Sequence, residues 1–120
     1  MFDWIEFLNL ARELSEETAL HSAQEAKLRS AISRAYYAAF HKAKTTILPT
    51  RGAGFGSHQE IIDILQESDD PARRQLGVDL ARLKGNRKKA DYDDVVANLS
   101  ALTEDSLLGA QELIDGFASL

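Results

Sequence analysis

The 120-residue chain has no cysteine, only two prolines and no long apolar run. Without cysteine, disulfides, thiolate catalysis and cysteine-ligated zinc are all excluded. No apolar run approaches the roughly 20 residues that a membrane-spanning helix needs. The N-terminal stretch MFDWIEFLNL has neither the basic flank nor the small-residue cleavage site of a secretory signal. The sequence therefore predicts a cytoplasmic protein with no membrane association.

The chain as a whole is acidic. Nineteen acidic side chains outnumber 14 basic ones, which gives a net charge of -5 and a pI near 5.1. This balance does not attract nucleic acid or an anionic membrane, so affinity for a polyanion would have to come from a local basic patch. A length of 120 residues predicts one domain, 1–120, which can bury a core but is too short for two domains.

Helix signals recur along the chain, and no segment alternates with the period of a strand. Capping residues at Asp3, Ser22, Ser57 and Asp70 predict four helix starts. Each of the first three is followed three positions later by a glutamate, as in a capping box. Asp70 is followed by a proline, which is favoured at the first position of a helix.

The expected helix ends complete the outline of the fold. The first helix should run to about Leu20, and the second should stop at Pro49. The stretch 49–56, PTRGAGFG, is the most loop-like of the chain. The fourth helix should end within residues 91–94, and a last helix should begin near Leu99. The sequence thus predicts an all-α fold, a four- to five-helix up-and-down antiparallel bundle.

The stretch 28–44, LRSAISRAYYAAFHKAK, is the clearest helix, because it is rich in alanine and lacks glycine and proline. At about 100° per residue, one arc is apolar and is expected in the core: Leu28, Ile32, Ala35, Tyr36, Ala39, Phe40, Ala43 and Ile47. The opposite side is a polar line of Ser30, Arg34, Tyr37 and His41. Periodicity alone leaves open whether this line is a solvated face or the wall of a functional site.

The segment 82–89, RLKGNRKK, concentrates positive charge, with five basic residues among its eight. Arg87 continues the helical spacing of the preceding leucines, so it stands where the helix had been burying apolar side chains. A buried guanidinium needs an anion, because leaving it unpaired costs several kcal/mol. Two interpretations are open. Arg87 either pairs with Asp91 one turn further on, or faces a groove and binds a phosphate, which its planar fork suits.

Three motifs together resemble a known family. They are SRAYYAAFHKA on the second helix, GSHQEII after the glycine loop, and RKKADYDD after a leucine-lined helix. In order and spacing, from about Ala26 to the C-terminus, they resemble the HEPN domains, and in particular the small stand-alone prokaryotic members. The resemblance implies a helical bundle that pairs into a homodimer. Many such domains are metal-independent ribonucleases, while others are toxins partnered by a small nucleotidyltransferase antitoxin, or non-catalytic RNA or nucleotide binders.

The family's catalytic motif is an arginine followed, after four to six residues, by a histidine, with the motifs of two subunits meeting in a cleft. Carried over by position, Arg87 matches the motif arginine. The histidine is missing, because Tyr92, Asp93 and Asp94 occupy the three candidate positions. A tyrosine, with an unperturbed pKa near 10, is a poor acid or base at neutral pH. His41 either replaces the motif histidine in the cleft or is an ordinary surface or hydrogen-bonded histidine.

These observations define one candidate site, which is expected to bind the phosphates of RNA or a nucleotide in a dimer cleft. Its catalytic candidates are Arg87 and His41. Its binding candidates are Arg34, Tyr37, Lys88, Lys89, Asp91 and Tyr92. His58, in the first turn of its helix, is expected to be structural. We expect no metal and no cofactor, because the three histidines lack ligand-like spacing with carboxylates.

The sequence also leaves a second function open. In this alternative the same polar groups form an internal network. The protein is then a non-catalytic interaction protein or a toxin–antitoxin component that pairs with a small nucleotidyltransferase. A short nucleotidyltransferase gene beside this one would favour the alternative.

Overall fold

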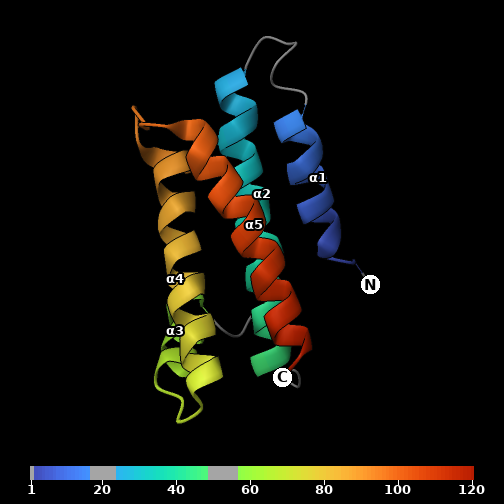
Figure 1. Ribbon diagram of the computed structural model, residues 1–120, viewed down its shortest axis with the longest axis vertical. Helices are drawn as coiled ribbons and strands as arrows, with labels where there is room; N and C mark the ends of the chain where they lie inside the picture. The colour runs from blue at the N-terminus through green and yellow to red at the C-terminus, as the bar shows by residue number, and fades with distance from the viewer. Residues whose placement is uncertain (1, 17–23, 49–56) are drawn as a thin grey trace.

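The computed structural model describes residues 2–16, 24–48 and 57–120, and over these ranges it contains five α-helices and no strand. The helices are α1 (Ile5–Glu16), α2 (Gln24–Ile47), α3 (His58–Gln66), α4 (Pro71–Tyr92) and α5 (Leu99–Ala118). The four longer helices alternate in direction along the bundle, while the short α3 packs against α4 (Figure 1). The predicted all-α antiparallel bundle is confirmed. None of the described helices is long and apolar enough to span a membrane.

Local capping chemistry sets several of the helix starts. At α3 the Ser57 hydroxyl accepts a hydrogen bond from the Glu60 backbone N–H, and the Glu60 side chain accepts one from the Ser57 backbone N–H. At α4 the Asp70 carboxylate accepts from the backbone N–H of Ala72. At α1 the Asp3 carboxylate accepts from the backbone N–H of Ile5. These three predicted caps are confirmed.

Some expectations concern parts of the chain outside the described residues. They are the cap at Ser22, the continuation of the first helix beyond Glu16, and the glycine loop 49–56. Within the described ranges, α4 ends at Tyr92 and α5 begins at Leu99, as the sequence predicted.

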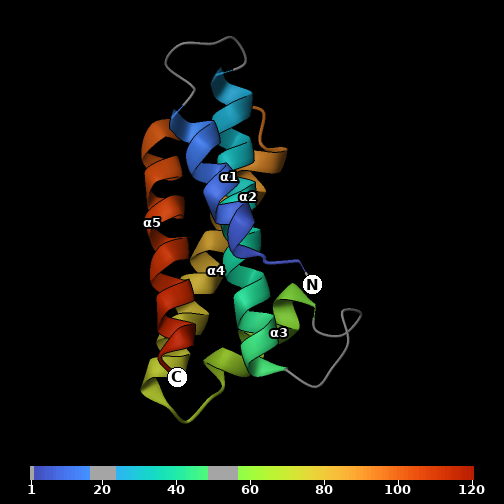
Figure 2. The ribbon, with the colours of Figure 1, turned by 90° about the vertical axis from the view of Figure 1, so that its right-hand side faces the viewer.

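The central element of the bundle is α2, which contacts every other helix. Figure 2 shows α1 lying over the upper part of α2 and α3 beside its lower end. The predicted core arc of α2 is buried, apart from the half-buried Ile47. Burial extends further round the helix than predicted, to Ala31, Ser33 and Ala38. Small alanine side chains let neighbouring helices approach α2 on several sides.

α3 and α4 pack so closely that one position requires glycine. A Cβ added at Gly77 would lie 2.8 Å from the Cβ of Leu65 and 3.0 Å from the backbone nitrogen of Gln66. Real Cβ atoms essentially never approach a neighbour as closely as the first of these distances, and neither contact can be relieved by turning a flexible side chain. The short helix α3 is thereby held directly against the first half of α4.

Candidate functional site

Arg87 lies on the buried face of α4, where it follows the buried Leu80 and Leu83. The residue is only 8% exposed. Its Nη1 lies 3.6 Å from Oδ2 of Asp91, which is long for a hydrogen bond. Its Nε is buried, and no described residue forms a hydrogen bond with it. Both interpretations of Arg87 therefore find support, because the ion pair exists but leaves a donor of the guanidinium unused.

Two tyrosines of α2 flank this guanidinium. The Cζ of Arg87 lies 5.5 Å from the ring centroid of Tyr36 and 5.7 Å from that of Tyr37. The two rings are inclined at 65° to each other, so they form a corner that receives the cation. A contact of this kind is worth about 0.5–2 kcal/mol, and it holds the cation without neutralising its charge.

Arg34, from the polar line of α2, adds a second guanidinium to the same group. Its Cζ lies 5.1 Å from the ring centroid of Tyr37 and 4.8 Å from that of Phe7 in α1. Its Nη2 donates to the Ser33 hydroxyl at 3.4 Å, and that hydroxyl donates to Oδ2 of Asp91 at 3.5 Å. The ring of Tyr37, one of the expected binding residues, is thus already contacted by two arginines.

His58, the first residue of α3, also belongs to this group. Its Nδ1 lies 2.7 Å from the Tyr36 hydroxyl, and its ring stacks on Phe40 with centroids 4.1 Å apart. Burial lowers the pKa of His58, and the positive charges of Arg87 and Lys84 lower it further. The sequence predicted a structural histidine here, and the hydrogen bond to Tyr36 agrees with that role. The sequence did not predict that His58 and Arg87 would lie near each other.

Lysines of α4 increase the positive charge around His58. The Nζ of Lys84 donates to Oε1 of Gln59 at 3.2 Å. The pKa of Lys84 is lowered first by burial and then by the charges of Lys88 and Arg87, while Asp63 acts in the opposite direction. Lys88 also lowers the pKa of His58.

Two of the expected site residues lie away from this group. Lys89 is exposed, and it is not among the charges that lower the pKa of His58 or Lys84. Tyr92 is 74% exposed at the end of α4, and no contact joins its ring to Arg87 within the described ranges. Both residues remain accessible on the surface next to the cluster.

We call the group that the structure brings together the Arg87 cluster. It combines side chains from α2, α3 and α4: Arg34, Tyr36, Tyr37, His58, Lys84, Arg87, Lys88 and Asp91. Its four cations outnumber its one carboxylate, and Asp63 near Lys84 adds only a second. The cluster is therefore positively charged although the chain carries a net charge of -5.

His41 lies beside the cluster in different surroundings. The Trp4 indole is stacked on its ring, with centroids 3.4 Å apart and planes inclined at 13°. Burial lowers the pKa of His41 to about 4, and the charges of Lys44 and His58 contribute. The ring centroids of His41 and Tyr37 lie 6.4 Å apart, so Tyr37 contacts both His41 and Arg87.

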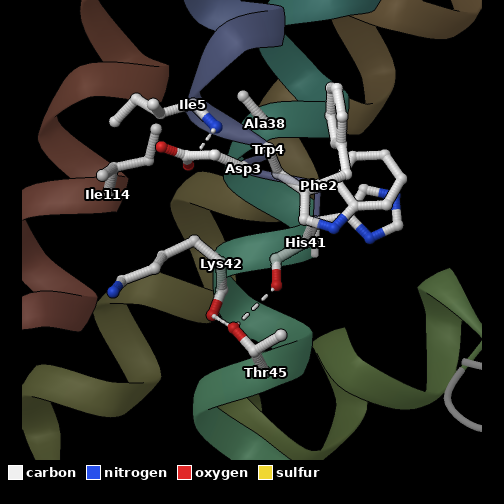
Figure 3. Close-up of a pocket in the computed structure, with 9 residues that line it drawn as sticks. All are labelled: Phe2, Asp3, Trp4, Ile5, Ala38, His41, Lys42, Thr45 and Ile114. Carbon is white, nitrogen blue, oxygen red and sulfur yellow. Dashed lines mark hydrogen bonds between the residues drawn. The ribbon is translucent and has the colours of Figure 1, made fainter. Parts of the chain in front are cut away.

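A hollow of about 290 Å³ lies beside His41, between α2, residues 2–5 and α5 (Figure 3). It is lined by Phe2, Asp3, Trp4, Ile5, Ala38, His41, Lys42, Thr45 and Ile114. Figure 3 shows the rings of Phe2 and Trp4 beside His41, while the Lys42 side chain extends away from them. Neither Arg87 nor His58 lines this hollow, which is therefore distinct from the Arg87 cluster.

Comparison with known proteins identifies the family. The model of one protein family, described as the HEPN domain, matches residues 6–117. The chain belongs to the HEPN family. HEPN proteins are mostly of the ribonuclease or toxin type. No curated protein and no solved structure matches this HEPN chain.

Arg87, which the sequence analysis matched to the arginine of the family motif, lies at the centre of the cluster, and no histidine follows it on α4. Among the described residues, no group of three or more histidine, cysteine, aspartate or glutamate side chains is arranged to hold a metal ion. His58 is the histidine whose pKa is lowered by the charge of Arg87, after the larger effect of burial.

Arg29 is a further important residue that sequence reasoning missed. Its Nη1 donates to the backbone carbonyls of Ala90 at 2.9 Å and Asp93 at 2.6 Å, and its Nη2 donates to that of Asp94 at 3.2 Å. A cation is favourable at the carbonyl end of a helix, so Arg29 ties α2 to the last turn of α4. One signal was present in the sequence, since Arg29 directly follows the core residue Leu28.

Proposed function

We propose that this HEPN protein binds the phosphates of RNA or a nucleotide at the Arg87 cluster. The observation that carries the proposal is the buried Nε of Arg87, which has no hydrogen-bond partner among the residues that the structure describes. Buried polar groups are nearly always satisfied in proteins, so an unused donor on a buried cation favours an external anion. A phosphate suits this donor, because its oxygens accept paired hydrogen bonds from the planar guanidinium.

The surrounding charges support the same function. Burial lowers the pKa of Lys84 most, and repulsion by the charges of Lys88 and Arg87 lowers it further. An arriving phosphate would relieve this repulsion. Such a local excess of cations attracts a polyanion even when the whole protein is acidic.

The chemistry of the cluster favours binding over hydrolysis. Cleavage through an RNA 2′-hydroxyl needs an acid and a base with pKa values near neutral. The pKa values of His41 and His58 are both lowered, so both rings are neutral at pH 7. Burial raises the pKa of Tyr36 well above its ordinary value, so its phenol stays protonated. We therefore propose that ribonuclease activity is weak or absent.

An RNA titration with paired variants tests the proposal. Arg87→Ala should weaken the binding of a fluorescein-labelled single-stranded RNA at least about tenfold, the effect of losing hydrogen bonds to a charged group. Arg82→Ala is the matched control, because Arg82 lies on the same helix but pairs with Asp105 of α5 at 2.6 Å. Equal affinities for the two variants would exclude the Arg87 cluster as the binding site.

The adjacent lysines provide a second matched pair. Lys88 is among the charges that lower the pKa of His58 and Lys84 and Lys89 is not, although the two carry the same charge and are both exposed. Lys88→Ala should lower the slope of log affinity against log salt by about 0.7, as expected for one lost contact to single-stranded RNA. Lys89→Ala should change it less. Incubation of the protein with total RNA in EDTA tests for metal-independent cleavage.

One observation favours a second function, the binding of a protein partner. Tyr92 and Val95 are 74% and 85% exposed at the end of α4. Exposed apolar side chains that lie close together are typical of interaction surfaces. We propose a nucleotidyltransferase as this partner, on the basis of the HEPN family. Co-expression with a nucleotidyltransferase encoded beside the gene should give a complex that Tyr92→Ser disrupts, while Val78→Ser, on a distant part of α4, should leave it intact.

A further inference from the structure

The hydrogen bond between Tyr36 and His58 determines which nitrogen of the imidazole carries the proton. The Tyr36 hydroxyl lies 2.7 Å from Nδ1 of His58, and Tyr36 is 1% exposed. The described residues offer this hydroxyl no other acceptor. Since a buried hydroxyl rarely remains without an acceptor, the phenol donates and Nδ1 accepts. A neutral imidazole that accepts at Nδ1 carries its proton on Nε2.

The remaining N–H of His58 is on the outer edge of the ring. The Nδ1 edge faces the buried Tyr36, and one face of the ring is stacked on Phe40. Nε2 lies on the opposite edge of the ring, and because His58 is only partly buried we infer that this edge is the accessible one. The positive charges that act on the ring come from α4, namely Arg87, Lys84 and Lys88, and from Lys44 of α2. The outer N–H therefore lies within a positively charged surface.

We propose that His58 is a second phosphate ligand of the Arg87 cluster, donating its Nε2–H to a phosphate oxygen, and that Tyr36 is the positioning residue that fixes this tautomer. The inference rests on the proposed function, since it names a further ligand of the same site. It assigns no acid–base role to His58, because the lone pair on Nδ1 is already used in accepting from Tyr36. A neutral N–H donor recognises an acceptor group such as a phosphate oxygen at any pH at which the ring stays neutral.

Two substitutions of His58 separate a ligand role from a structural one. Glutamine extends far enough to place an amide N–H near the position of Nε2, whereas asparagine reaches only the region of Nδ1. His58→Asn should weaken the binding of a fluorescein-labelled 12-nucleotide single-stranded RNA about tenfold, as expected for one lost hydrogen bond to a charged group. His58→Gln should weaken it by about threefold or less. Equal losses in the two variants would overturn the proposal.

Nitrogen chemical shifts of the imidazole test the tautomer without any RNA. In the free protein at pH 7.5, His58 should show a protonated Nε2 and an unprotonated Nδ1. Tyr36→Phe keeps the buried ring but removes the hydroxyl, so it should produce a mixture of the two tautomers and weaken RNA binding about twofold, the effect of halving the fraction with a protonated Nε2. A protonated Nδ1 in the unsubstituted protein would overturn the proposal.

The two experiments also separate this inference from the function on which it depends. If the unsubstituted protein binds RNA and loses binding in Arg87→Ala, but His58→Asn and His58→Gln behave alike, only the role of His58 is overturned. If the unsubstituted protein does not bind RNA, the proposed function fails, and the phosphate-ligand role of His58 fails with it. Thermal melts of each variant show whether a loss of binding is due to unfolding.

Discussion

The indole of Trp4 lies flat on the imidazole of His41, with ring centroids 3.4 Å apart, and this contact accompanies a pKa of about 4 for the histidine. In the unfolded chain His41 should titrate near its ordinary value of 6.5. Between pH 6.5 and pH 4 the unfolded chain therefore binds a proton that the folded protein does not. The contribution of the neutral His41 to the free energy of unfolding is complete above pH 6.5 and is lost as the pH falls toward 4.

We expect the free energy of unfolding to fall over this pH window, and to fall less steeply in His41→Gln. The lowered pKa of His58 acts in the same direction, so the slope should be reduced rather than abolished. Urea melts at several pH values provide the measurement. The emission of Trp4, the single tryptophan, should also titrate with a midpoint near pH 4. A midpoint near 6.5 would show that the pKa of His41 is not lowered in the folded protein.

Arg87→Ala should destabilise the fold by about 2 kcal/mol. This value lies above the roughly 0.5 kcal/mol of ordinary surface positions and below the roughly 3–5 kcal/mol of a fully buried broken pair. The reason is that Arg87 is more enclosed than an open groove position, being 8% exposed, whereas the Asp91 side chain that it leaves behind is 29% exposed. Urea melts beside Arg82→Ala give the comparison, and a change below about 0.5 kcal/mol would show that Arg87 contributes little to stability.

Asp91→Asn should strengthen RNA binding about threefold while changing stability by at most about 1 kcal/mol, since a partly exposed ion pair contributes no more than that. The carboxylate of Asp91 now partly neutralises Arg87, so it competes with an arriving phosphate. A filter-binding titration at two salt concentrations measures the effect. Weaker binding in this variant would mean that Asp91 orients Arg87 for the ligand instead of competing with it.

Arg29→Met should loosen the end of α4. The substitution removes a cation that donates to three backbone carbonyls, and we expect a loss of about 2–3 kcal/mol, as for hydrogen bonds to a charged group. Hydrogen exchange should accelerate at the backbone amides of residues 89–93. Arg29→Lys keeps the charge but not the planar fork of donors, so its loss of stability should lie between that of the unsubstituted protein and that of Arg29→Met. Unchanged exchange in Arg29→Met would show that the last turn of α4 does not depend on this side chain.

We expect a homodimer at micromolar concentration. The HEPN family supplies the motivation, and the structure adds exposed apolar side chains that an interface would cover, such as Leu108 at 62% and Val78 at 52%. Sedimentation velocity at three concentrations gives the mass. A single species near the chain mass of 13.3 kDa, without concentration dependence, would contradict the prediction.

Features that depend on neighbours in the sequence were predictable. The cap at Ser57 and the start of α4 at Asp70 follow from short-range hydrogen bonds, and the core role of Tyr36 follows from helical spacing. The placing of Arg87 among buried leucines was predictable for the same reason. Local signals of this kind are complete within one or two turns of helix.

Features that depend on how the helices pack were not predictable. His58 and Arg87 are 29 positions apart in the sequence, and only the packing of α3 against α4 brings them together. The polar line of α2 was left as either solvated or functional. In the structure α1 and the residue before it partly cover this line, because Phe7 of α1 packs against Arg34 and Trp4 stacks on His41. Periodicity identifies the faces of a helix but not the neighbour that each face meets.

The contact at Gly77 has a mechanical consequence for the Arg87 cluster. Because Leu65 and Gln66 leave no room for a Cβ there, α3 and α4 are in close contact at this point, and we expect the two helices to move together. His58, Lys84 and Arg87 belong to this pair of helices, whereas Tyr36 and Tyr37 belong to α2. Any widening of the cluster to admit a bulky ligand must therefore occur as a hinge opening between α2 and the α3–α4 pair.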